Sequence, residues 1–152
     1  MLGKIRISIA EKARIGMYLI DTNVVSEARN GKKANFGVQM FWKNINADDL
    51  YLSVQTIGEI RRGIENIQHR GDLPQAKKLE KWLNQIVDDY ADRILVFDEA
   101  CAQVWGKLMS PHNQNPIDKQ IAAIALINGL TVVTRNVDDF RGMGVELQNP
   151  FL

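Results

Sequence analysis

The sequence predicts an α/β protein, a three-layer α/β/α sandwich whose sheet is mostly parallel and has about five strands. Short apolar runs alternate along the chain with longer segments in which apolar residues recur at helical spacing. This alternation favours parallel strands joined by helical crossovers, with helices on both faces of the sheet. With 152 residues, 45% hydrophobic and 24% charged, the chain suits one globular domain with a full core.

Five apolar runs are predicted to be the strands, and the first is the most informative. Residues 17–20 are uncharged and stop at Asp21, after which Thr22 or Asn23 can cap a helix that begins near Val24. Asp21 is therefore expected at the carboxyl end of a buried strand, the edge where ligands bind in open parallel sheets. The other strands are predicted at residues 50–54, 94–97, 131–134 and 145–147.

The helices are predicted from the spacing of their apolar residues. Asp98 is expected to cap one helix, and Pro116 and Gly129 to bound another that is apolar on nearly every side. Such a helix must be buried, and Asp118 in its first turn is its only acid. Further helices are predicted at residues 23–29, 37–46 and 74–90, and from Thr56 onward.

Composition narrows the classes of function. A net charge of +1 argues against general adhesion to nucleic acid or membranes, so any contact with nucleic acid must come from a local cluster of Arg and Lys. The single cysteine, Cys101, excludes an internal disulfide and a cysteine-based zinc cluster. No apolar run approaches the length of a membrane span, so we expect a cytoplasmic protein with no membrane partner.

The N-terminal stretch is predicted to lie outside the domain. Residues 1–16 precede the first core strand, which begins at Met17, and they alternate isoleucines with polar residues. We interpret them as an extension that forms an edge strand, stays disordered or is read from an upstream start codon and is not native. Residues 17–152 are then one domain.

Several polar residues fall at strand ends or helix starts, which the topology rule places at one edge of the sheet: Asp21, Glu59, Asp118, Asn136 and Asp139. Most have a purely structural explanation as well. Thr56 and Glu59 have the spacing of a capping box, Asp118 is favoured by the helix dipole, and Asp139 suits a helix start. Asp21 is the exception, because its neighbours can supply the cap.

Carboxylates that converge at a sheet edge repel one another and raise each other's pKa unless a divalent cation neutralises them. Oxygen ligands without Cys or His favour Mg²⁺ or Mn²⁺ over zinc. A cation there activates water and stabilises the charge that develops on a phosphodiester. Thr134 can hydrogen-bond a ligand or merely end its strand. Four arginines could bind flanking phosphates or lie on a solvated surface: Arg61, Arg62, Arg135 and Arg141.

Four motifs follow one another in the chain. They are an apolar run with Asp-Thr-Asn-Val at residues 21–24, and Thr-Ile-Gly-Glu-Ile-Arg-Arg-Gly at residues 56–63. Pro-Ile-Asp-Lys-Gln-Ile-Ala-Ala follows at residues 116–123, and Thr-Val-Val-Thr-Arg-Asn-Val-Asp-Asp-Phe at residues 131–140. In this order they resemble the PIN-domain toxins, most closely the VapC and FitB type, often described as plasmid stability proteins. The resemblance runs from Met17 to the C-terminus.

The resemblance implies a PIN-like fold and a metal-dependent endoribonuclease. Such an enzyme is the toxin of a type II toxin–antitoxin pair, is held inactive by a DNA-binding antitoxin, and forms a homodimer. The family's catalytic metal ligands correspond to Asp21, Glu59 and Asp118. The fourth acid of the family pattern is Asn136 here, which leaves open whether one or two cations bind, because a neutral side chain binds a cation less well. Asp139 is a candidate substitute.

Two alternatives come from other classes of protein. Phosphohydrolases of the haloacid dehalogenase type also begin with a strand that ends in Asp, but they usually need a second Asp two residues later, where this chain has Asn23. A PIN-like scaffold that binds RNA or a partner without cleaving is the other alternative. The sequence does not name the RNA, whose recognition we expect in the helices of residues 37–91.

Overall fold

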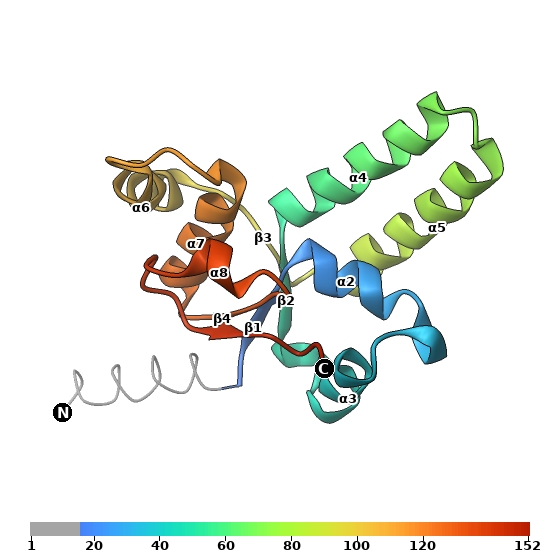
Figure 1. The fold of residues 1–152 in the computed structure, drawn as a ribbon, viewed down its shortest axis with the longest axis horizontal. Helices are drawn as coiled ribbons and strands as arrows, with labels where there is room; N and C mark the ends of the chain where they lie inside the picture. The colour runs from blue at the N-terminus through green and yellow to red at the C-terminus, as the bar shows by residue number, and fades with distance from the viewer. Residues whose placement is uncertain (1–15) are drawn as a thin grey trace.

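A computed structural model describes residues 16–152, and its centre is a five-stranded sheet (Figure 1). The prediction about residues 1–16 falls, apart from Gly16, outside the described part and stays a prediction. The strand order is β3-β2-β1-β4-β5, and every neighbouring pair is parallel, which confirms the predicted fold class. The strands are β1 (Tyr18–Ile20), β2 (Leu50–Ser53), β3 (Ile94–Leu95), β4 (Thr131–Val133) and β5 (Leu147–Gln148).

Successive side chains of β1 point to opposite faces of the sheet and so enter two separate cores. Ile20 belongs to a cluster that buries residues of α2 (Thr22–Ala28), α3 (Phe36–Asn44), α4 (Val54–His69) and α5 (Leu73–Asp89). Leu19 belongs to a second cluster, formed with α6 (Glu99–Met109), α7 (Pro116–Asn128) and α8 (Val137–Phe140). Helices therefore cover both faces, as Figure 1 shows, and the three-layer arrangement is confirmed.

Two helices begin earlier than their sequences suggest. Asp21 itself caps α2, because its Oδ1 accepts the backbone N–H of Thr22 at 2.9 Å. Ser53 caps α4 by accepting the N–H of Thr56 at 3.2 Å, so Thr56 already lies inside the helix. The predicted capping box between Thr56 and Glu59 is therefore wrong. Asp98 caps α6 as predicted, with Oδ1 3.0 Å from the N–H of Cys101.

The last helices and strands agree with the predictions only in part. Pro116 is at the start of α7, and Gly129 ends it with φ of 67°, the left-handed conformation expected there. Only the middle of α7 is fully buried, because Ile117 and Ile127 are exposed. The strand predicted at 94–97 is shorter than expected, since Val96 is already 62% exposed where the chain turns toward α6. The final strand lies at 147–148 instead of 145–147.

The strand order reverses beside β1, which creates a crevice at the carboxyl edge of the sheet. From β1 the chain steps to β2 and then β3 on one side, and β4 returns to the other side of β1. The backbone N–H of Asp21 donates to Val133 O at 2.9 Å, which joins the ends of β1 and β4 at this point. Within residues 16–152, no helix is both long and apolar enough to span a membrane.

Candidate active site

Asp21 is the most deeply buried acid at this edge, with only 6% of its surface exposed. Its Oδ2 accepts the hydroxyl proton of Thr134 at 2.8 Å, and its Oδ1 accepts the Thr22 N–H. Burial raises the pKa of Asp21, the two hydrogen bonds oppose that shift, and the nearby charge of Asp139 adds to it. The side chain is thus both a helix cap and a charged group facing other acids.

Asn23 ties the two strand ends together around Asp21. Its amide nitrogen lies 3.4 Å from Asp21 Oδ2 and 3.4 Å from Thr134 Oγ1, and its oxygen accepts the N–H of Arg135 at 3.1 Å. The sequence identifies Asn23 as a possible cap and as the residue at the place of a second Asp, but it does not predict these bonds to Asp21, Thr134 and Arg135. Because an amide fills the place of a second Asp, the dehalogenase-type alternative lacks its general acid.

Glu59 lies in the second turn of α4, where it has no capping role. Its Oε1 accepts the hydroxyl proton of Thr22 at 2.8 Å. Burial raises the pKa of Glu59, and the charge of Asp21 adds to the rise, whereas the bond from Thr22 and the charge of Arg62 oppose it. The charge of Asp21 therefore reaches Glu59 in the second turn of α4.

Asp118 differs from Asp21 and Glu59 because no hydroxyl group of the described residues donates to its carboxylate. It is half-buried in the first turn of α7, and within residues 16–152 its carboxylate makes no hydrogen bond or ion pair. Burial, followed by the charges of Asp21, Asp139 and Glu59, raises the pKa of Asp118 to about 6. The structure thus brings the four predicted acids into one electrostatic cluster, which we call the acid edge: Asp21, Glu59, Asp118 and Asp139.

The donor chemistry of the acid edge fits a hard divalent cation, since every candidate ligand is an oxygen and the like charges destabilise one another. The arrangement is nevertheless open. Among the described residues, no three acidic, histidine or cysteine side chains are grouped closely enough to hold a metal ion. Asn136, at the fourth acid position, donates its backbone N–H to Thr134 Oγ1 at 3.0 Å, and its side chain caps nothing.

The predicted phosphate-binding residues differ in whether their side chains are available to donate to a phosphate. Arg61 lies 2.9 Å from Glu80 and 3.6 Å from Glu65, so α5 and its own helix hold its guanidinium. Arg62 lies near enough to Glu59 to influence its pKa. Arg135 stacks over the ring of Phe151, 4.8 Å from the centroid, and has no carboxylate partner in the described residues. Thr134 donates its only hydroxyl proton to Asp21, which leaves none for a phosphate.

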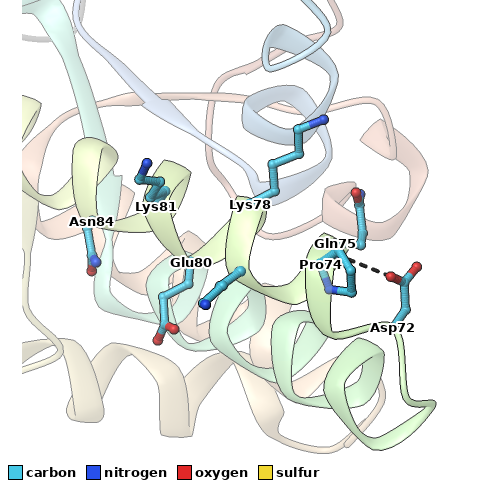
Figure 2. A pocket seen from close by; sticks show the side chains of 8 residues that line it. Asp72, Pro74, Gln75, Lys78, Glu80, Lys81 and Asn84 are labelled. Carbon is cyan, nitrogen blue, oxygen red and sulfur yellow. Dashed lines mark hydrogen bonds between the residues drawn. The ribbon is translucent and has the colours of Figure 1, made fainter.

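One hollow on the surface lies away from the acids. It measures about 760 Å³, and Figure 2 shows that α5 and the residue before it supply its lining, including Lys78 and Lys81. A smaller groove of about 200 Å³ between α2, α4 and α5 does reach the acid edge, because Thr22 and Glu59 line one end. Arg29, which sequence reasoning missed, also lines this groove and lies over the ring of Trp82 at 5.6 Å.

The fold and the site place the chain in the class of three-layer α/β proteins that carry acids at a topological switch point. Comparison with known proteins then identifies the family. The PIN domain profile matches residues 18–145, so the chain belongs to the PIN domain family. It is 36% identical over 143 residues to plasmid stability protein StbB of Pseudomonas syringae pv. tomato, covering 89% of this chain and 99% of StbB. Toxin FitB of Neisseria gonorrhoeae is 34% identical, with the same coverage of both chains.

A third relative and a solved structure agree with this assignment. VapC ribonuclease Y4jK of Sinorhizobium fredii is 27% identical over 145 residues, covering 89% of this chain and 98% of the relative. The crystal structure of FitAcB from Neisseria gonorrhoeae superposes with a TM-score of 0.78 at 32% identity, over 88% of this chain and 98% of that one. The resemblance seen in the sequence motifs is therefore confirmed.

Proposed function

We propose that the protein is a Mg²⁺- or Mn²⁺-dependent endoribonuclease and the toxin of a type II toxin–antitoxin pair. The convergence of Asp21, Glu59 and Asp118 at the switch point carries this proposal. Burial raises the pKa of each of these three acids, and the charges of nearby carboxylates add to the rise. The names of relatives support it, since one is a toxin, one a ribonuclease and one a plasmid stability protein.

In this proposal the acid edge holds the cation, with Asp21, Glu59 and Asp118 as ligands. Asp139 and the neutral Asn136 complete the ligand set on the β4 side, and fewer charges there favour a single cation. When bound, the cation supplies an activated water and stabilises charge on the phosphodiester. Asp21 is oriented for this task by Thr134 and by Asn23.

The residues around the acid edge bind and orient the RNA. Arg62 and Arg135 donate to the phosphates that flank the cleaved bond, since neither has an ion-pair partner among the described residues. Arg61 contributes only if it leaves Glu80. The groove that runs from Glu59 to Trp82 extends the surface along which a single strand can lie.

The proposed partners are a DNA-binding antitoxin, which inhibits the enzyme in the cytoplasm, and a second copy of the chain in a homodimer. Similar solved structures titled FitAB bound to DNA and DNA-bound VapBC support the antitoxin. Leu73 and Val87 leave apolar surface exposed on α5, which suits a subunit contact. A monomeric mass at micromolar concentration without antitoxin would count against the dimer.

Cleavage of total RNA by purified protein, with Mg²⁺, with Mn²⁺ and with EDTA, tests the proposed activity. Cleavage that appears with either cation and stops with EDTA is expected. The open arrangement of the acid edge favours one rival, a scaffold that binds RNA without cutting it. RNA binding without cleavage under any of the three conditions would establish that rival.

A further inference from the structure

Three hydroxyl groups form a row behind Glu59. Ser53 Oγ lies 3.4 Å from Thr56 Oγ1, and Thr56 Oγ1 lies 3.1 Å from Thr22 Oγ1. The row ends where Thr22 Oγ1 meets Glu59 Oε1 at 2.8 Å. Ser53 and Thr56 are fully buried, and buried hydroxyls are costly unless they are hydrogen-bonded. The row therefore forms a continuous chain of hydrogen bonds from the core to the carboxylate.

The chemistry of the groups fixes the direction of this chain. An ionised carboxylate only accepts, so Thr22 donates its single hydroxyl proton to Glu59. The oxygen of Thr22 must then accept from Thr56, and the oxygen of Thr56 accepts from Ser53. Ser53 also accepts the backbone N–H of Thr56 at 3.2 Å, which leaves its own proton free for the chain. Each hydroxyl donates once, and all the donors point toward Glu59.

We propose that Thr22 is a positioning residue that, supported by Thr56 and Ser53, holds the Glu59 carboxylate ready for the cation. This proposal rests on the proposed function. The glutamate side chain is long and flexible, and the bond at Oε1 removes much of that freedom before the cation arrives. Within the described residues Oε2 has no hydrogen-bond partner, so it stays available as a ligand. Groups that orient metal ligands commonly affect metal affinity about 10–100-fold.

A purely structural role would look different. The bond between Ser53 and the Thr56 N–H caps α4 and does not involve Thr22. Thr22 belongs to α2, so its bond to Glu59 also ties α2 to α4 across 37 residues of sequence. If this tie served only the fold, loss of the Thr22 hydroxyl would lower the melting temperature and leave metal affinity unchanged.

Titration of the purified protein with Mn²⁺ alone, without RNA, separates these roles. Thr22→Val removes the hydroxyl and keeps the shape, and we expect it to weaken Mn²⁺ binding at least about tenfold. Thr22→Ser keeps the hydroxyl and should bind like the wild type. Ser26→Ala is the matched control, since Ser26 lies on the same helix and has no hydrogen-bond partner in the described residues. Wild-type affinity in Thr22→Val, or equal losses in the Val and Ser variants, would overturn the proposal.

A double-mutant cycle without metal tests the contact itself. Thr22→Val, Glu59→Ala and the double variant are melted in EDTA, and we expect the two single shifts to sum to more than the double shift, because both single variants remove the same bond. Additive shifts would overturn the proposal even if the enzyme binds metal normally. A wild type that binds no Mn²⁺ but shows the coupling would instead refute the proposed metal-dependent activity and leave the contact intact.

Discussion

The two sides of the acid edge differ in how their carboxylates are held. On the β1 side, Asp21 and Glu59 each accept a threonine hydroxyl proton, from Thr134 at 2.8 Å and from Thr22 at 2.8 Å. On the α7 side, Asp118 has no such donor within residues 16–152, and its pKa rises to about 6. The supported pair is held by hydrogen bonds from the protein itself, whereas in the proposed function Asp118 depends on the cation to neutralise it.

This difference explains how an open acid edge is compatible with metal binding. Hydrogen bonds to Asp21 and Glu59 favour their charged forms and so prepare two ligands at modest cost. Within residues 16–152 the Asp118 carboxylate has no hydrogen-bond donor and no ion-pair partner, and under the proposed function its charge would attract a divalent cation. Variants that remove or weaken one side at a time test this difference.

The largest effect is expected from Asp21→Asn, which removes charge from the most buried member of the supported side. If this charge contributes several kcal/mol to stabilising the transition state, its loss lowers the rate of RNA cleavage by about 10³-fold or more. The amide keeps the volume and the acceptor for Thr22 N–H, so the melting temperature should change little. Cleavage rate and growth inhibition are the measurements, and a well-expressed variant that stays toxic would contradict the role of Asp21.

Glu59→Gln tests the other supported acid. Because Glu59 has no capping role and the amide oxygen can still accept from Thr22, stability should hardly move while cleavage collapses. Glu65→Gln is the matched control on the same helix, since Glu65 is exposed and, among the described residues, pairs only with Arg61 at 3.6 Å. We expect the control to cleave like the wild type. Full activity in Glu59→Gln would remove this residue from the site.

The smallest effect is expected from Asp118→Asn, measured as the thermal stability of the protein without metal. The pKa of Asp118 is about 6 in the folded protein and 3.8 as its ordinary value, so the folded state binds this proton more tightly. The contribution of Asp118 to the free energy of unfolding therefore falls as pH rises from about 4 to about 6. In EDTA, Asp118→Asn should therefore melt about 2 °C above the wild type at pH 7, and the difference should vanish near pH 4. A pH-independent difference would show that the charge of Asp118 is not the cause.

The sequence predicts the fold, and it predicts that the acids lie at one edge of the sheet, because both depend on local patterns. The role of the acids stays a prediction. The apolar run before Asp21 identifies a buried strand, and the parallel topology then brings strand ends and helix starts to one edge. Helix caps are predicted less well, since Ser53 and Thr56 are equally suited to capping and only the end of β2 decides between them.

Contacts between distant residues could not be read from the sequence. The sequence allows Arg61 either to bind phosphate or to lie on a solvated surface, and it does not predict the ion pair with Glu80, which lies 19 residues away on α5. The bond between Thr22 and Glu59 joins two helices in the same way, and the motif around Asp21 gave no indication of it. Such pairs depend on how α2, α4 and α5 pack against one another. Hydrophobic periodicity predicts which face of each helix is buried, but not which helix it meets.

The most direct test of a single metal site is the thermal shift that Mn²⁺ produces in the wild type and in Asp118→Asn at pH 7. If Asp118 shares one cation with Asp21 and Glu59, a hundredfold excess over Kd should stabilise the wild type by about 2.7 kcal/mol and raise its melting temperature. The shift should be much smaller in Asp118→Asn. Equal shifts in the two proteins, or none in either, would show that these carboxylates do not form one metal site.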